Sequence, residues 1–177
     1  AVERIDLTLT LPGYDIERDT LGYDTIDVAG FHLYANPGHP LLPHAWIDVA
    51  LPPDVDWDSV TLHIDGVERK ELSGAYHLPL ATTDRSLCNA GDDAIAGSSS
   101  FPNPASAISQ PVRIQQLSQM RKWRFARLDF SPFNWIPETG RLSYAAKVDI
   151  WLEFTRTGHG SSAESMSDTV MDDVARG

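Results

Sequence analysis

The alternation of apolar and polar residues over residues 142–154, LSYAAKVDIWLEF, most constrains how this chain can fold. Every second position is apolar, whereas Lys147, Asp149 and Glu153 fall between the apolar positions. A repeat of two residues is typical of a strand with one buried face. The pattern therefore predicts one long strand whose buried side chains are Leu142, Tyr144, Ala146, Val148, Ile150, Leu152 and Phe154.

The same repeat occurs in three shorter stretches. These are RIDLTLTL (4–11), WIDVAL (46–51) and SVTLHID (59–65). The stretch TIDVAGFHLY (25–34) fits two short strands or one bulged strand, and PVRIQQL (111–117) and KWRFARLDF (122–130) complete the set. In the last of these, a change of phase near Arg127 predicts a bulge.

Turn residues separate these strands, and helical periodicity is missing from residues 1–157. PETG (137–140) and IDGV (64–67) carry turn chemistry and are expected to connect strands. The sequence therefore predicts an all-β fold, an antiparallel and jelly-roll-like β-sandwich.

Two segments lack the strand pattern. Residues 82–110 are rich in Gly, Ser, Ala and Pro and predict a long inter-strand loop, which in a compact domain is usually either functional or disordered. Residues 158–177 predict a linker followed by a short C-terminal helix. We therefore expect a sandwich domain over 1–157 and a tail over 158–177.

The stretch NPGHPLLP (36–43) combines three prolines with a glycine directly before a predicted strand. Proline fixes its own φ angle and favours extended geometry in the residue before it. We expect an extended segment with Leu41 or Leu42 anchored in the core.

Charge excludes two classes of partner. The chain has a net charge of −11, whereas proteins that bind nucleic acids or anionic membranes present basic faces. No apolar run approaches the ~18 residues of a membrane-spanning helix. Nucleic acids and membranes are therefore not expected as partners.

Catalytic and metal motifs are weak. The single cysteine, Cys88, excludes an intrachain disulfide and a cysteine zinc cluster. Cys88 and His159 could form a nucleophile–base pair, but no third residue is placed to orient the base. No cofactor is expected. Calcium stays open, because Asp54, Asp56 and Asp58 imitate the start of a calcium loop, although Ser59 occupies the place of its glycine.

Three stretches resemble gingipain-type propeptides (peptidase family C25) in their order and spacing. They are GHPLLPHAWIDVALP (38–52), ELSGAYHLPLA (71–81) and RKWRFARLDFSPFNWIPETGRLSYAAKVDIWLEF (121–154). The resemblance covers roughly residues 25–157. The chain departs from the family pattern in its inter-strand loop, which is longer and rich in small residues.

This resemblance implies a secreted or cell-surface β-sandwich prodomain that is not itself an enzyme. Such a prodomain helps its cysteine-peptidase catalytic domain to fold and keeps it latent, by laying a loop with a basic side chain across the active site. In this chain the corresponding loop is 82–110, and its only basic residue is Arg85, beside Asp84, Ser86 and Leu87. Arg176 and Gly177 mark an expected processing point.

Two alternatives stay open. Arg85 could simply pair with Asp84 or Asp92 in solvent. The domain could also be a non-catalytic adhesion or carbohydrate-binding module, because the phase of their strands places Trp46 and Trp151 outward, where they could bind sugars or another protein domain.

Overall fold

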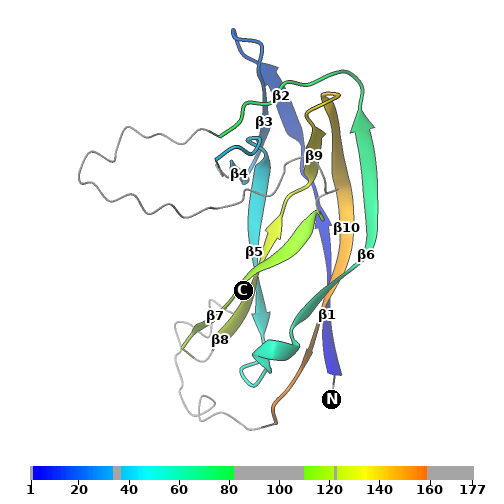
Figure 1. Cartoon of the computed structure of the whole chain (residues 1–177). Helices are drawn as coiled ribbons and strands as arrows, with labels where there is room; N and C mark the ends of the chain where they lie inside the picture. The colour runs from blue at the N-terminus through cyan, green and yellow to red at the C-terminus, as the bar shows by residue number, and fades with distance from the viewer. Residues whose placement is uncertain (1, 34–36, 82–109, 122, 159–177) are drawn as a thin grey trace, which may run out of the picture.

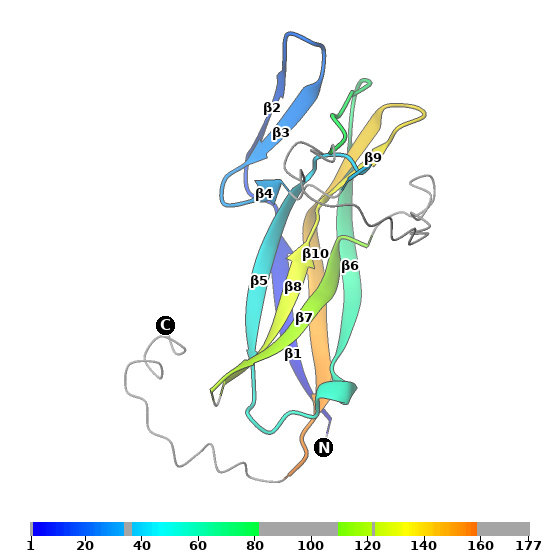
Figure 2. The same cartoon turned by 60° about the vertical axis from the view of Figure 1, so that its left-hand side comes forward.

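Two antiparallel sheets packed face to face form the body of the computed structural model, which describes residues 2–33, 37–81, 110–121 and 123–158. One sheet has the order β1-β10-β6 (Val2–Thr10, Arg141–Thr155, Thr61–Leu72), and β9 (Phe133–Ile136) pairs with the start of β10. The other has the order β4-β5-β8-β7 (His32–Leu33, Pro43–Leu51, Trp123–Phe130, Val112–Met120). Figure 2 shows β5, β8 and β7 in front of β1, β10 and β6. The predicted all-β sandwich is confirmed.

A separate hairpin, β2 (Tyr14–Arg18) with β3 (Asp24–Val28), lies at the same end of the sandwich as the β9–β10 turn (Figure 1). A short 3-10 helix, η1 (Trp57–Ser59), precedes β6. Within the described residues, no helix is long and apolar enough to cross a membrane. The expected C-terminal helix falls in 159–177, outside the described residues.

The core has two parts. The larger cluster lies between the two sheets and is built from Leu9, Val49, Leu51, Val55, Val112, Ala126, Leu128, Phe130, Ala145, Val148, Ile150, Leu152 and Phe154. The smaller cluster joins the hairpin to the sandwich and consists of Ile26, Val28, Leu78, Phe133 and Leu142. Burial of these side chains is the main force that holds the sheets and the hairpin together.

The long strand predicted over 142–154 exists as β10, with one change of phase. Ala146 is an extra residue opposite β6, because Ala145 pairs with Arg69 and Lys147 with Glu68. The bulge shifts the alternation, so Ala145 is buried where the sequence predicted Ala146. Beyond the bulge, Val148, Ile150, Leu152 and Phe154 are buried as predicted.

The turn predicted at IDGV was wrong. Strand β6 runs through these residues, with Asp65 as an extra residue between the pairs Ile64–Ile150 and Gly66–Asp149. A long partner strand keeps the chain extended there, and the Asp-Gly pair makes a bulge rather than a turn. The PETG turn is confirmed, because the Gly140 N–H donates to the Ile136 carbonyl (2.8 Å).

The bulge expected in β8 near Arg127 was also wrong. Gln115 of β7 is the extra residue, since Ile114 pairs with Leu128 and Gln116 with Arg127. Strand β8 keeps its phase with Ala126, Leu128 and Phe130 in the core. The apparent slip arises because Arg124 takes the next inward position, where its guanidinium covers Trp57 and bonds the Val55 carbonyl.

Candidate partner-binding site

Residues 37–43 hold the chain just before residue 82, where the described backbone stops. Pro40 bridges to Leu80, and the N–H of Ala81 donates to the His39 carbonyl (2.8 Å). In return the N–H of Gly38 donates to the carbonyl of Ala81 (2.9 Å). Leu42 packs against the smaller cluster, as predicted for the proline-rich stretch. This stretch therefore fixes the chain that leads into the segment 82–109.

The chain that follows this segment is fixed to the same sheet. The N–H of Ser131 donates to the Pro111 carbonyl (2.8 Å), and Val112 pairs with Phe130 at the start of β7. Val112 is fully buried. The described residues on both sides of the segment 82–109 are thus anchored to the β4-β5-β8-β7 sheet or to the chain that leads into it.

A buried carboxylate, Asp129, lies beside the second anchor. Its Oδ2 accepts hydrogen bonds from Nε (2.9 Å) and from the terminal nitrogen of Arg113 (2.7 Å), and its Oδ1 lies 2.9 Å from His44 Nδ1. Burial by itself raises the pKa of Asp129, but the hydrogen bonds from His44 and Arg113 outweigh it, so the pKa lies below its ordinary value. The ionised carboxylate therefore ties β5, β7 and β8 together at the anchor.

Ser131, His44 and Asp129 are the residue types of a catalytic triad, but they do not have the geometry of a triad. Ser131 Oγ lies 2.7 Å from His44 Nδ1, the same nitrogen that contacts Asp129. A triad needs one ring nitrogen for the nucleophile and the other for the acid, so that the base can accept the hydroxyl proton. This arrangement fits a structural network rather than an activated serine.

The outer face of the β5-β8-β7 sheet carries aromatic side chains and one closed ion pair. Trp46 is 49% exposed, and His32 from β4 lies 6.2 Å from it, ring centroid to ring centroid. The Arg127 guanidinium lies 5.8 Å from the Trp46 ring and binds both carboxylate oxygens of Asp48 (2.7 and 2.8 Å). Such a combination of tryptophan, arginine and neutralised charge is common at protein interfaces.

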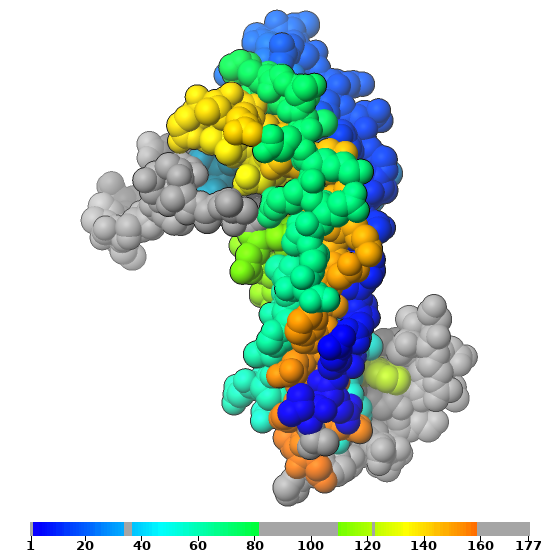
Figure 3. All heavy atoms as spheres, turned by 90° about the vertical axis from the view of Figure 1, so that its right-hand side faces the viewer, coloured from blue at the N-terminus to red at the C-terminus, as the bar shows by residue number. Residues whose placement is uncertain are grey.

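The outer face of the β1-β10-β6 sheet, which faces the viewer in Figure 3, is different in character. The ring of His63 stacks on Trp151 (5.0 Å, 10° between planes), and Arg4 covers the same ring at 5.0 Å. Both outward tryptophans are where the sequence placed them, but Trp151 is partly covered by its neighbours whereas Trp46 is half exposed.

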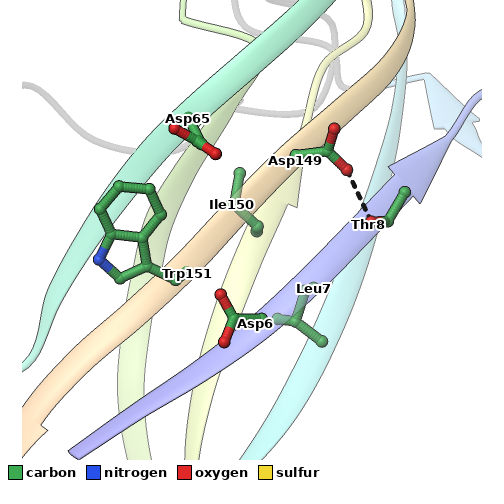
Figure 4. A pocket seen from close by; sticks show the side chains of 7 residues that line it. All are labelled: Asp6, Leu7, Thr8, Asp65, Asp149, Ile150 and Trp151. Atoms are coloured by element: carbon green, nitrogen blue, oxygen red, sulfur yellow. Dashed lines mark hydrogen bonds between the residues drawn. The ribbon is translucent and has the colours of Figure 1, made fainter.

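Beside Trp151 lies a hollow of about 230 Å³ lined by Asp6, Leu7, Thr8, Asp65, Asp149, Ile150 and Trp151 (Figure 4). The hydroxyl of Thr8 donates to Asp149 (2.7 Å), Lys147 lies 3.0 Å from the same carboxylate, and Arg4 pairs with Asp6. Two of its three carboxylates are thus already bound to neighbouring side chains.

The calcium candidates do not converge. Asp54 binds Arg156 Nε (2.7 Å), while the Asp56 side chain accepts the Asp58 N–H (3.2 Å) and caps η1. Across the described ranges, no group of three or more His, Cys, Asp or Glu residues could hold a metal ion.

The remaining sequence candidates fall outside the described residues. They are Asp84, Arg85, Ser86, Leu87, Cys88, His159, Arg176 and Gly177. In contrast, sequence reasoning missed Asp129, Arg113 and Ser131, because no local pattern indicates which strands bring them together.

The fold defines an antiparallel β-sandwich domain with a half-exposed tryptophan on the outer face of β5-β8-β7. No protein-family model matches the chain, and no curated protein matches it. Solved structures do match it, among them two from Porphyromonas gingivalis. A structure on the zymogenic latency of gingipain K matches with a TM-score of 0.61 at 15% identity, over 87% of this chain and 88% of that one.

The second is a complex of the RgpB pro- and mature domains, with a TM-score of 0.66 at 12% identity, over 98% of this chain and 90% of that one. At these identities the match establishes a shared fold. The resemblance to gingipain-type propeptides that the motifs indicated is confirmed at that level.

Proposed function

We propose that this chain is the secreted propeptide of a gingipain-like cysteine peptidase, acting as an intramolecular chaperone and latency inhibitor without catalysis of its own. The observation that carries the proposal is the end-to-end fold match to structures described by zymogenic latency and by pro- and mature domains. The three ordered motifs and the net charge of −11, which disfavours nucleic acids as partners, support the same function. The partner is the catalytic domain of the peptidase.

In this proposal the segment 82–110 lies across the active site of the peptidase, and Arg85 enters the specificity pocket. A guanidinium pairs with a buried carboxylate in a directional, bidentate manner, so an arginine in such a pocket is bound strongly and specifically. The firm anchors on both sides of the segment support this role, because a tethered inhibitor loses less entropy on binding than a free peptide. Arg176 and Gly177 form the processing point in the same proposal.

Arg85→Ala is expected to weaken inhibition by tens-fold or more, because the acidic pocket loses its partner at a cost of ~2–5 kcal/mol. The melting temperature should change little, since both described core clusters lie elsewhere in the chain. The measurement is the inhibition constant of each domain against an Arg-specific gingipain-type peptidase.

Asp92→Ala is the matched control in the same segment. Should Arg85 act only through an ion pair with Asp92, the two variants would lose inhibition equally. Equal inhibition by Arg85→Ala and the wild type would remove Arg85 from the mechanism. A wild-type domain that inhibits no such peptidase would favour the adhesion or carbohydrate-binding alternative.

A further inference from the structure

We infer that the peptidase catalytic domain docks on the outer face of the β5-β8-β7 sheet, and not on the outer face of β1-β10-β6. This inference rests on the proposed function and adds to it the surface that supplies the affinity outside the active site. We call this surface the docking face and define it by Trp46, Asp48, Met120, Trp123, Phe125 and Arg127.

The strand register places these side chains on one face. Residues paired directly across an antiparallel ladder point to the same side of the sheet. Asp48 pairs with Arg127, and Met120 pairs with Trp123. Phe125 lies between Trp123 and Arg127 in the same phase of β8. The residues that alternate with them along β8, Ala126 and Leu128, belong to the core. The docking face therefore points away from the core.

The docking face has little uncompensated charge. Strands β5, β7 and β8 contain only two carboxylates, and each lies against an arginine: Asp48 against Arg127, and Asp129 against Arg113. Covering charges that are already paired costs less desolvation energy than covering free ones. In a chain of net charge −11, this face is suited to burial by another protein.

The opposite sheet carries more charged groups. Strands β1, β6 and β10 carry seven carboxylates: Glu3, Asp6, Asp65, Glu68, Glu71, Asp149 and Glu153. Five of these are in ion pairs: Glu3 with Arg156, Asp6 with Arg4, Glu68 with Lys70, Glu71 with Arg141 and Asp149 with Lys147. Covering this sheet would still desolvate more charged groups than covering β5, β7 and β8. Its tryptophan, Trp151, is already covered by His63 and Arg4, whereas Trp46 and Met120 remain 49% and 55% exposed.

The connectivity identifies the occupant. Only residues 110 and 111 separate the segment 82–109 from strand β7, and β5 begins at the end of residues 37–43, which hold Ala81. A partner reached by this segment therefore meets the β5-β8-β7 sheet first. Aromatic and arginine side chains in the centre of such a contact supply most of its binding energy.

The test compares two outward tryptophans on opposite faces. Binding of the full chain to the RgpB and gingipain K mature domains is measured by calorimetry for the wild type, Trp46→Ala and Trp151→Ala. We expect Trp46→Ala to raise the dissociation constant at least tenfold, and Trp151→Ala to change it less than twofold. Melting temperatures of the free domains check that both variants are folded.

A second pair of variants adds a large side chain instead of removing one. Ala50 is exposed and pairs with Phe125, and Thr10 is exposed and pairs with Lys147 in the opposite sheet. Ala50→Arg should weaken binding at least tenfold, whereas Thr10→Arg should not. Tight binding by both Trp46→Ala and Ala50→Arg would overturn the docking face and leave the proposed function intact. Failure of the wild type to bind either mature domain would overturn the proposed function itself, and this inference with it.

Discussion

At the scale of single residues, Asp129 holds the candidate site in place. Its side chain is 3% exposed and joins Arg113, the second residue after the Pro111 anchor, to His44 on β5. A buried carboxylate is stable only when its oxygens are bound, and here both are. The residue therefore fixes the start of β7, which follows the segment 82–109.

Asp129→Asn is expected to destabilise the domain by ~2–3 kcal/mol near neutral pH, because it removes charge-assisted hydrogen bonds and leaves Arg113 and His44 without their anion. The pKa of Asp129 is lowered in the folded state, so its contribution is complete above the unfolded pKa of about 4 and is lost as the pH falls through the folded pKa. The difference in unfolding free energy between wild type and variant should therefore shrink below about pH 4.

Denaturant melts of both proteins from pH 7 to pH 3 measure this difference. The control is Asp27→Asn, at an exposed position of β3, which should match the wild type throughout. A difference that stayed constant across this pH range would show that the charge of Asp129 is not what stabilises the site.

At the scale of elements, three single-residue insertions shape the sheets. Ala146, Asp65 and Gln115 are each an extra residue opposite a regular partner strand. Bulges add local twist and change which side chains point inward. The first two lie on the β6–β10 ladder, which is the longest pairing of the sandwich and is bulged twice.

Substitutions at two glycines distinguish a true turn from a bulged strand. Gly140, at the PETG turn, has φ +67°, and an added Cβ would lie 3.1 Å from the backbone N and O of Tyr76. Gly140→Ala should therefore cost about 1–3 kcal/mol. The φ angle of Gly66 lies outside the left-handed region, and the atom nearest to an added Cβ would be Asp149 Oδ2 at 4.0 Å. Gly66→Ala should be neutral or stabilise by up to about 1 kcal/mol.

Thermal unfolding of the two variants provides the measurement. A loss of stability in Gly66→Ala as large as that in Gly140→Ala would mean that IDGV forms a turn after all and that β6 ends before it.

At the scale of the whole molecule, the two outer faces differ in their charged groups and in the exposure of their tryptophans. The strands β1, β10 and β6 carry seven carboxylates, five of them in ion pairs, and their outward tryptophan is covered, whereas the β5-β8-β7 face has fewer charged groups and a half-exposed tryptophan. Between them lies the larger core cluster, and the smaller one carries the β2–β3 hairpin. Of the two faces, β5-β8-β7 is therefore the better suited to burial by a partner.

The domain boundary near residue 157 is open to a direct test. Every residue of both described core clusters lies before residue 155, and Arg156 and Thr157 bind Asp54. A chain ending after Gly158 should therefore melt within about 2 °C of the full chain, because a loss of 1 kcal/mol would already shift a domain of this size by about 2–4 °C. Calorimetry of the two chains measures the shift, and a larger fall would place part of the folding unit in residues 159–177.

The sequence by itself determined most of the strands, most of their buried faces and hence the sandwich, because a repeat of two residues is a local property that burial on one side of a sheet imposes. It did not indicate β2 or β9. It also determined the PETG turn and the anchoring of the proline-rich stretch through Leu41 or Leu42, and the structure shows that Leu42 packs against the smaller cluster. Only the tertiary structure decided that Ala145 rather than Ala146 is buried, that IDGV continues a strand, and that Asp129 meets Arg113 and His44. Each of these depends on which residue of a distant strand lies opposite, and the ladder register that sets this is a property of two segments together rather than of either one.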